Sequence, residues 1–373
     1  MQINMSGIHL RTRTDGSFRF SYDPIDRVIS VKNISGSANK FNLTVLNAPL
    51  RVVAEITSLC NLRCSYCSQG DVKKGKAAIR RLDTEDIKQI VDQADDAKVL
   101  EFTFRGAEAT LHPDFAAIWD YAAQKDFISI NLITNGMRLD KNIANMMLAN
   151  PRSKIIVSLD GPEEINSTFR NPQQYKKVMT WLPQTLSRSG DQIVVLSTLY
   201  KENLPYMHGF AAALAETGLK HFHVTLLKRL GETKNGIVNF VTPDEMSDLE
   251  NKLDDVAKSN PGFLPSVNCP LTKREINLST GVPMPLFTEY FCGTGMKIMV
   301  DGSIGISQII YFNNEFRQRM EACTSTSLNG LGIVGSGRSL QEIWSRSLEL
   351  RIAQAHLAKQ QYPFFLGFSD ETL

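Results

Sequence analysis

Short apolar runs alternate with amphipathic stretches through the middle of the chain. Six of these runs have the length and composition of buried strands, at residues 52–56, 100–104, 128–133, 154–159, 193–197 and 221–227. The stretches between them carry apolar residues at helical spacing, for example Ile87, Ile90 and Val91. Strands that alternate with helices are typical of a parallel sheet covered by helices. Six units are too few for a complete eight-fold barrel, so the pattern predicts an α/β fold built as a partial (β/α)6 barrel.

Polar residues mark where several helices begin. Within the repeat we expect helices at residues 113–123, 141–148, 174–186 and 206–217. A further helix is expected to begin with Thr84 as its N-cap. Thr242 with Glu245, and Ser339 with Glu342, have the spacing of capping boxes. Each pair predicts a helix that begins after its hydroxyl residue.

The first 48 residues have a different pattern. Phe18, Phe20 and Tyr22 alternate with polar residues, and a turn at residues 23–26 separates them from a second apolar run at 28–31. This pattern predicts a β-hairpin. Two roles stay open for it: it caps an edge of the main sheet, or it recognises the substrate.

The alternation is expected to stop after Gly231. From about residue 261, glycine, proline, serine and threonine become frequent beside short strand candidates. We therefore expect three regions, namely an N-terminal β-hairpin region at residues 1–48, the partial barrel at 49–240 and a C-terminal α+β extension at 241–373.

Composition narrows the class of protein without identifying it. The chain has 373 residues and a formal net charge of +2, which gives no reason to expect nucleic acid as a partner. No apolar run approaches the roughly 18 residues of a membrane span, and residues 1–14 lack the pattern of a secretory signal. A thiol-rich site without disulfide pairing fits a reducing compartment. We therefore expect a soluble, cytoplasmic protein without a membrane partner.

Cys60, Cys64 and Cys67 are the strongest chemical signal, because half of the six cysteines fall within eight residues, directly after the first predicted strand. Their spacing is too tight for a disulfide framework, and it lacks the second pair of ligands that a structural zinc site needs. Three thiolates on one loop suit an iron–sulfur cluster, since each can bind a different iron while the fourth iron stays open. The alternative is three unrelated buried cysteines. Parallel sheets of this kind gather function on the loops after their strands, which supports the cluster.

This loop resembles the cysteine motif of the radical S-adenosylmethionine enzymes, which commonly have an aromatic residue before the third cysteine, as Tyr66 is here. The resemblance continues at the exits of the next strands. Residues 106–109, Gly-Ala-Glu-Ala, are similar to the family's Gly-Gly-Glu-Pro motif with alanine at two positions. Residues 134–136, Thr-Asn-Gly, and 158–162, Ser-Leu-Asp-Gly-Pro, follow in the family's order, and Arg170 also matches. The matching part runs from about residue 50 to 230.

The resemblance implies one four-iron cluster held by Cys60, Cys64 and Cys67, with S-adenosylmethionine on its fourth iron. The residues that would bind this cofactor are Gly106, Ala107, Glu108, Thr134, Asn135, Ser158, Asp160 and Arg170. Gly106 and Ala107 would let the backbone approach the methionine amine, which Glu108 would bind. Because Ala107 carries a β-carbon where the family prefers glycine, we expect an ordinary backbone angle there.

Ser158 and Asp160 would bind the ribose, and Arg170 would bind the methionine carboxylate. Structural alternatives stay open for each residue. Glu108 could be only a helix-entry carboxylate, and Asn135 with the glycine after it could be only a turn. Ser158 and Asp160 could cap the next helix, and Arg170 could be a surface residue.

The C-terminal extension resembles a SPASM domain, which carries auxiliary iron–sulfur clusters in many peptide-modifying radical enzymes. The similar residues are 292–295, 299–307 and 339–344. Ser307 stands where the family has its second cysteine, so the usual ligand set is incomplete. Either Cys269, Cys292 and Cys323 bind one auxiliary cluster, or the fold persists without metal. Cys292 or Cys323 could also donate a hydrogen atom to a substrate radical, and inert buried cysteines are the alternative.

The resemblance implies reductive cleavage of S-adenosylmethionine to a 5′-deoxyadenosyl radical, which takes hydrogen from a substrate carbon. A ribosomally made peptide is the expected substrate, and a sugar or aminoglycoside is the alternative. A reductant such as flavodoxin or ferredoxin is the expected partner. A non-catalytic iron–sulfur or electron-transfer protein is the alternative from another class, although it would not need the cofactor-binding residues.

Overall fold

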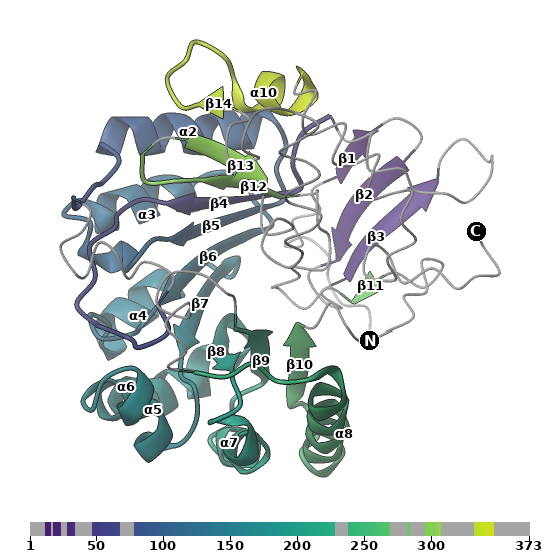
Figure 1. Cartoon of the computed structure of the whole chain (residues 1–373). Helices are drawn as coiled ribbons and strands as arrows, with labels where there is room; N and C mark the ends of the chain where they lie inside the picture. Colours follow the sequence, from purple (N-terminus) through teal and green to yellow (C-terminus); the bar gives the residue numbers. More distant parts are fainter. Residues whose placement is uncertain are drawn as a thin grey trace.

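Figure 1 shows the computed structural model of the chain, which describes residues 12–15, 18–23, 28–33, 47–67, 78–227, 238–268, 282–283, 295–301, 303–306 and 332–346. The described strands form one sheet of ten strands and one of four. Within this part of the chain, no helix has the length and apolar character that crossing a membrane requires.

The core is a parallel sheet whose central strands follow chain order. They are β4 (Arg51–Glu55), β5 (Glu101–Arg105), β6 (Ser129–Thr134), β7 (Ser153–Ser158), β8 (Ile193–Leu199) and β9 (His221–Leu226). Each pairs in parallel with the next. The helices between them are α2 (Thr84–Asp96), α3 (Phe115–Ala123), α4 (Lys141–Met147), α5 (Glu163–Phe169), α6 (Gln174–Ser189) and α7 (Met207–Glu216). The expected α/β fold with a partial barrel is confirmed, and α5 is an additional helix.

Alternate residues of each strand point to opposite faces of the sheet: the outer layer is apolar, whereas the inner face combines polar residues with a small apolar cluster around Ile156 and Val194. Phe102 and Phe104 of β5 are fully buried in the main apolar core, where the rings of Phe104 and Trp119 are 6.1 Å apart. Thr103 lies between them in the strand and accepts a hydrogen bond from Asn131 Nδ2 of β6 at 3.2 Å. The inner face is therefore only partly filled by aliphatic side chains, which fill the interior of closed barrels.

The sheet continues past β9, so the expectation that the alternation stops after Gly231 is wrong. α8 (Pro243–Ser259) begins at the predicted capping box, and β10 (Leu264–Asn268) follows and pairs in parallel with β9. Proline has no backbone N–H and is confined to sheet edges, so Pro265 weakens the strand signal in the sequence. The expected domain boundary at residue 240 stays a prediction, although α8 and β10 extend the core.

The expected N-cap of the first helix is wrong by one residue. Thr84 is the first residue of α2, and Asp83 precedes it as the N-cap without a side-chain capping hydrogen bond. The Thr84 hydroxyl donates instead to Asp114 Oδ2 at 2.6 Å. A contact with a residue distant in sequence therefore takes the hydroxyl away from the capping position.

The C-terminal part of the chain extends the other edge of the core sheet. β12 (Gly295–Ile298) pairs in parallel with β4, and β13 (Ser303–Ile306) and β14 (Gly332–Ile333) follow in antiparallel order. α10 (Leu340–Arg346) begins at the predicted capping box, where Glu342 N donates to Ser339 Oγ at 3.1 Å. Its Leu340 N donates to Gln93 Oε1 of α2 at 2.9 Å.

The N-terminal strands form the smaller sheet. β1 (Thr12–Asp15), β2 (Phe18–Asp23) and β3 (Val28–Asn33) pair antiparallel in chain order. The predicted hairpin is confirmed by the pairing of β2 with β3. β11 (Val282–Pro283) adds a fourth strand from the C-terminal region.

Candidate active site

The cysteine loop, residues 58–67, follows β4 at the carboxyl end of the core sheet. Cys64 is buried, whereas Cys60 and Cys67 are partly exposed. Leu62 N donates to Cys60 Sγ at 3.4 Å, and Asn135 Nδ2 lies 3.8 Å from the same sulfur. Hydrogen bonds to cysteine sulfur are among the features that set the potential of an iron–sulfur site. The loop therefore combines a partly open thiol face with donors to one sulfur.

The three thiols fit a cluster of several irons. Among the residues that the structure describes, no three His, Cys, Asp or Glu side chains are placed to hold one metal ion together. A cube does not require such convergence, because each thiolate binds a different iron. The donor set and its spacing thus agree with the four-iron cluster that the resemblance implies.

An apolar shell surrounds the cysteine loop. Its buried members are Leu62, Cys64, Tyr66, Tyr200, Leu227 and Val238, and Met137, Phe169 and Phe240 pack against them. These residues come from the loops after β4, β6, β8 and β9 and from the end of α5. An apolar shell limits solvent access and so controls the potential of a redox site.

The exit of β5 runs beside the chain that enters the cysteine loop. Ala107 N donates to Thr57 O and Glu108 N donates to Leu59 O, both at 2.9 Å. Gly106 has a φ of +156°, and a β-carbon there would lie 2.4 Å from Thr57 O. Only glycine fits such an approach. Ala107 is not among the non-glycine residues with positive φ, which confirms the ordinary backbone angle expected for it.

Glu108 connects the exits of β5 and β6. Its carboxylate accepts from Thr134 Oγ1 at 2.8 Å, from Asn135 N at 2.7 Å and from Thr110 Oγ1 at 2.5 Å. It also accepts from Thr110 N as the N-cap of the short helix η2 (Ala109–Leu111). Burial raises the pKa of this carboxyl, and the hydrogen bonds offset only part of that effect. Glu108 is thus a helix-entry carboxylate and also a link between two strand exits.

Residues 134–136 form a tight turn that places Asn135 against the cysteine loop. The side chain of Asn135 donates to Asn61 Oδ1 at 2.8 Å and accepts from Met137 N at 2.9 Å. Gly136 has a φ of +76°, and a β-carbon there would lie within 3 Å of the side chains of Val157 and Val178. The glycine makes the turn possible, and the turn brings an amide to the cysteines.

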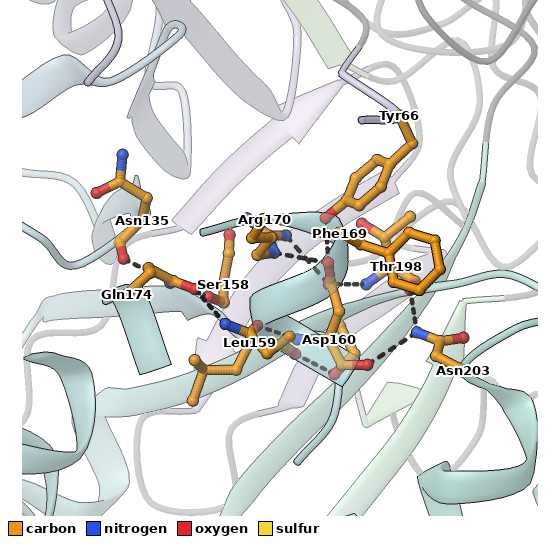
Figure 2. Close-up of polar contacts among 12 residues, drawn as sticks. Tyr66, Asn135, Ser158, Leu159, Asp160, Phe169, Arg170, Gln174, Thr198 and Asn203 are labelled. Carbon is orange, nitrogen blue, oxygen red and sulfur yellow. Dashed lines mark hydrogen bonds and ion pairs between the residues drawn. The ribbon is translucent and has the colours of Figure 1, made fainter. Parts of the chain in front are cut away.

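Asp160 is the buried carboxylate at the exit of β7 (Figure 2). It is fully buried and accepts from Arg170 Nε at 2.6 Å, from Arg170 Nη2 at 3.1 Å, from Thr198 N at 2.9 Å and from the Tyr66 hydroxyl. Ser158 lies at the end of β7 and is 8% exposed. The residue before α5 is Pro162, without a side-chain cap, so neither Ser158 nor Asp160 caps that helix.

Arg170 is not a surface residue. Its side chain is 9% exposed and forms an ion pair with Asp160. Its guanidinium also lies 5.6 Å from the ring centre of Tyr66. Burial opposes the charge, but Asp160, Tyr66 and Cys64 together raise the pKa of Arg170 well above its ordinary value. Arg170 therefore stays charged at the side of the cysteine loop.

Three fully buried amides support these residues, and sequence reasoning missed all three. Asn166 accepts from Asp160 N at 3.0 Å, and its own amide donates to Gln174 Oε1 at 2.7 Å. Gln174 Nε2 donates to the carbonyls of Asn135 and Ser158, both at 2.7 Å (Figure 2). Asn203 Nδ2 donates to Asp160 O at 2.9 Å. Amides on helices and turns usually face solvent, so nothing in their spacing marked them.

The inner face of the sheet carries buried charges. Arg51, Glu101 and Lys154 are at most 9% exposed. Burial raises the pKa of Glu101 despite the two cations near it. His223 Nδ1 and Ser266 Oγ share a hydrogen bond of 2.8 Å. Burial and, to a lesser extent, the charge of Arg51 lower the pKa of His223 to about 3. Arg51 and Glu101 are the first residues of β4 and β5, so these charges lie at the amino end of the sheet, opposite the cysteine loop.

Cys269, Cys292, Ser307 and Cys323 lie outside the described residues. The auxiliary cluster, the metal-free alternative and the role of Cys292 or Cys323 as hydrogen donor therefore stay predictions.

Comparison with known proteins gives a family model and several relatives. Residues 54–211 match the model of the Radical SAM superfamily. The mycofactocin maturase MftC of Mycolicibacterium smegmatis is 29% identical over 175 residues, which cover 46% of this chain and 43% of MftC. The antilisterial bacteriocin subtilosin biosynthesis protein AlbA of Bacillus subtilis is 27% identical over 190 residues, which cover 50% of this chain and 41% of AlbA. The chain thus spans less than half the length of these curated relatives.

A crystal structure of Streptococcus suis SuiB has the same fold. It aligns with a TM-score of 0.67 over 98% of this chain and 99% of SuiB. The two sequences are 12% identical, so this likeness concerns the fold alone.

Proposed function

This chain belongs to the Radical SAM superfamily through residues 54–211, and we propose that it binds one four-iron, four-sulfur cluster at Cys60, Cys64 and Cys67 and S-adenosylmethionine beside it. The observation that carries the proposal is the meeting of four strand exits at the cysteine loop. Glu108 joins the exits of β5 and β6, and Tyr66 joins the loop to the exit of β7. SuiB, whose fold is similar, has been crystallised with S-adenosylmethionine bound.

When bound, these two groups supply one-electron cleavage of the sulfonium to a 5′-deoxyadenosyl radical, which takes a hydrogen atom from a substrate carbon. The chain's own contribution is to exclude water. Leu62, Leu227 and Val238 are buried around the cysteines and carry no polar group that would hold water there.

Arg170 is the proposed partner of the methionine carboxylate. A guanidinium has five N–H donors, and Asp160 takes two of them. The others are available for a second carboxylate, while Asp160 holds the charge in place. Asp160 therefore acts through Arg170 and not as a ribose ligand, since its oxygens already accept four hydrogen bonds.

The remaining cofactor contacts come from the strand exits. The backbone of Gly106 and Ala107 approaches the methionine amine, and Ser158 is the proposed ribose contact. Thr134 and Asn135 hold the turn that aims an amide at the cysteines. Glu108 maintains this arrangement through its bonds to both strand exits.

A ribosomally made peptide is the proposed substrate. MftC is named a maturase, AlbA takes part in bacteriocin biosynthesis, and SuiB has been crystallised with its precursor peptide SuiA. The reductant is proposed to be a flavodoxin or ferredoxin.

The test is peptide modification coupled to cofactor cleavage. The full chain would be reconstituted anaerobically with iron and sulfide, reduced, and incubated with S-adenosylmethionine and precursor peptides from neighbouring genes. We expect one peptide to change mass in step with 5′-deoxyadenosine, and deuterium on its reacting carbon to enter that product. The Cys64→Ala variant should abolish both signals. Cofactor cleavage that responds to a sugar, with every peptide unchanged, would contradict the peptide assignment.

A further inference from the structure

Tyr66 connects the cysteine loop to the end of β7. It lies between two of the cysteines in sequence, and its hydroxyl donates to Asp160 Oδ2. Both side chains are buried, at 9% and 0% exposure. Figure 2 shows the Tyr66 hydroxyl pointing at the carboxylate.

The Asp160 carboxylate has no spare acceptor site. Its four contacts come from the Tyr66 hydroxyl, two nitrogens of Arg170 and the Thr198 backbone. A carboxylate offers about four lone-pair sites. Because these donors belong to the cysteine loop, the end of α5 and β8, one buried group fixes three segments against each other.

The loop has a second attachment next to the first. Ser65 N and Ser65 Oγ both donate to Phe169 O, at 2.9 and 3.3 Å. Ser65 thus attaches the loop directly to the end of α5, whereas the side chain of Tyr66 reaches that end through Asp160, which bonds Arg170. The hydroxyl of Tyr66 is the part of this attachment that a single-atom change can remove.

We infer that the Tyr66 hydroxyl is a positioning group for the cluster site: with Asp160 and Arg170 it forms a buried interlock that holds the cysteine loop at the exits of β7 and β8. The aromatic ring alone would fill the same space. The hydroxyl also fixes the orientation of the ring, because it bonds a carboxylate that cannot move without losing its other donors.

The interlock also sets the charge beside Cys64. Ser65, next to Cys64, bonds the carbonyl of Phe169, next to Arg170, and the Arg170 guanidinium lies 5.6 Å from the ring centre of Tyr66, so this cation lies beside the cysteine loop. A cluster gains a negative charge on reduction, and a nearby cation favours that gain. This part of the inference rests on the proposed function, whereas the attachment of the loop does not.

Tyr200 offers a matched control for Tyr66. Its ring lies 5.4 Å from that of Tyr66, and its side chain is fully buried. Its hydroxyl has no hydrogen-bond partner among the described residues. Tyr66→Phe and Tyr200→Phe therefore remove the same atom from neighbouring buried rings, but only the first removes a bond.

The first measurement uses the iron-free full chain, in which amide hydrogen exchange reports opening of the loop. We expect the amides of residues 61–67 to exchange about tenfold faster in Tyr66→Phe and at the wild-type rate in Tyr200→Phe. In the wild-type chain, the amides of Ser65 and Thr198 should exchange at similar rates, because the interlock opens as one unit. This wild-type comparison holds even where a variant fails to fold.

The second measurement is the midpoint potential of the reconstituted cluster. Tyr66→Phe removes the hydroxyl that bonds Asp160, so the negative charge of this carboxylate is less compensated. Reduction of the cluster should then become about tenfold less favourable, which lowers its midpoint potential by about 59 mV for one electron. Iron content should be unchanged, and Tyr200→Phe should keep the wild-type potential.

The outcomes separate the inference from the proposed function. Equal exchange of the loop in both tyrosine variants, or independent exchange of Ser65 and Thr198 in the wild type, would overturn the interlock whatever the protein's activity. Faster loop exchange in Tyr66→Phe without any cluster assembly would support the interlock and count against the proposed function alone. An unchanged potential beside faster exchange would overturn the electrostatic part.

Discussion

The exits of β5 and β7 each place a buried carboxylate beside the cysteine loop, but the two carboxylates have different partners. Glu108 accepts only from neutral donors, namely two threonines and the backbone of Asn135. Asp160 accepts from a phenol, a backbone amide and a buried guanidinium. Both carboxylates are at most 1% exposed.

The difference shows what holds each exit in place. At β5, backbone contacts and a glycine define the path of the chain. The carboxylate of Glu108 adds hydrogen bonds from neutral donors. These bonds lower its pKa, but burial raises the pKa by more. At β7, a charge pair holds three segments, so neither partner can be removed alone without leaving a buried charge. The β5 exit is thus held by close packing of the backbone, and the β7 exit is held by a buried ion pair.

The largest effect should come from removing the charge of Asp160. Asp160→Asn leaves Arg170 buried beside an uncharged amide, so unfolding of the iron-free chain in urea should show a loss of about 3–5 kcal/mol. Asp92 gives an exposed version of the same arrangement, since it bonds the Tyr121 hydroxyl at 2.7 Å and pairs with Lys125 at 2.5 Å. Asp92→Asn should cost at most about 1 kcal/mol. Similar losses in the two variants would contradict the role of charge at β7.

A smaller effect should separate the glycines of the two exits. Gly106 and Gly161 have φ values of +156° and +151°, so alanine carries similar backbone strain at both. At Gly106 the new β-carbon meets the backbone oxygen of Thr57 at 2.4 Å, whereas at Gly161 it meets a side-chain carbon of Ile165 at 3.1 Å. Gly106→Ala should therefore be less stable than Gly161→Ala by about 1–3 kcal/mol in the same urea assay. The reverse order would count against shape as the feature that holds the β5 exit.

Glu108→Gln should lower the free energy of unfolding by about 1–3 kcal/mol, because the N–H groups of the new amide face the hydrogen-bond donors of residues 110, 134 and 135. Glu245→Gln, in the exposed capping box of α8, should lower the free energy of unfolding by clearly less than Glu108→Gln does. Equal unfolding midpoints for the two variants would show that the link between β5 and β6 is not carried by this carboxylate.

The smallest effect is on the pH dependence of stability. Because the pKa of Glu108 is raised in the folded chain, the folded state holds this proton more tightly than the unfolded state. The stability that this proton supplies is complete below the ordinary glutamate pKa of 4.5 and is lost as the pH rises through the folded pKa. The unfolding free energy of the wild-type chain, relative to Glu108→Gln, should therefore increase as the pH is lowered from 7, by about 1.4 kcal/mol per unit of pKa shift. A decrease over that range would contradict the neutral environment of Glu108.

Features carried by neighbouring residues could be predicted from the sequence. The six central strands, the capping boxes at Thr242 and Ser339 and the position of the cysteines after β4 depend on local patterns. The loops that follow the strands could be expected to meet at one end of the sheet, because the carboxyl ends of parallel strands lie together.

Features carried by distant partners could not be predicted. Tyr66 and Asp160 are 94 residues apart, so their hydrogen bond leaves no trace in either segment. Gln174 reads as an ordinary helix-start residue, yet it is fully buried between two strand exits. β10 was missed because Pro265 obscures an edge strand, and its pairing becomes evident only beside β9.

The most direct test of the account is whether the cysteine loop cleaves S-adenosylmethionine. Anaerobically reconstituted, reduced wild-type chain and the Cys60/Cys64/Cys67→Ala variant would be incubated with S-adenosylmethionine, and 5′-deoxyadenosine would be measured by liquid chromatography. We expect multiple equivalents of this product per wild-type chain and none from the variant. A wild-type chain whose cluster is complete by spectroscopy but which forms no 5′-deoxyadenosine would contradict it.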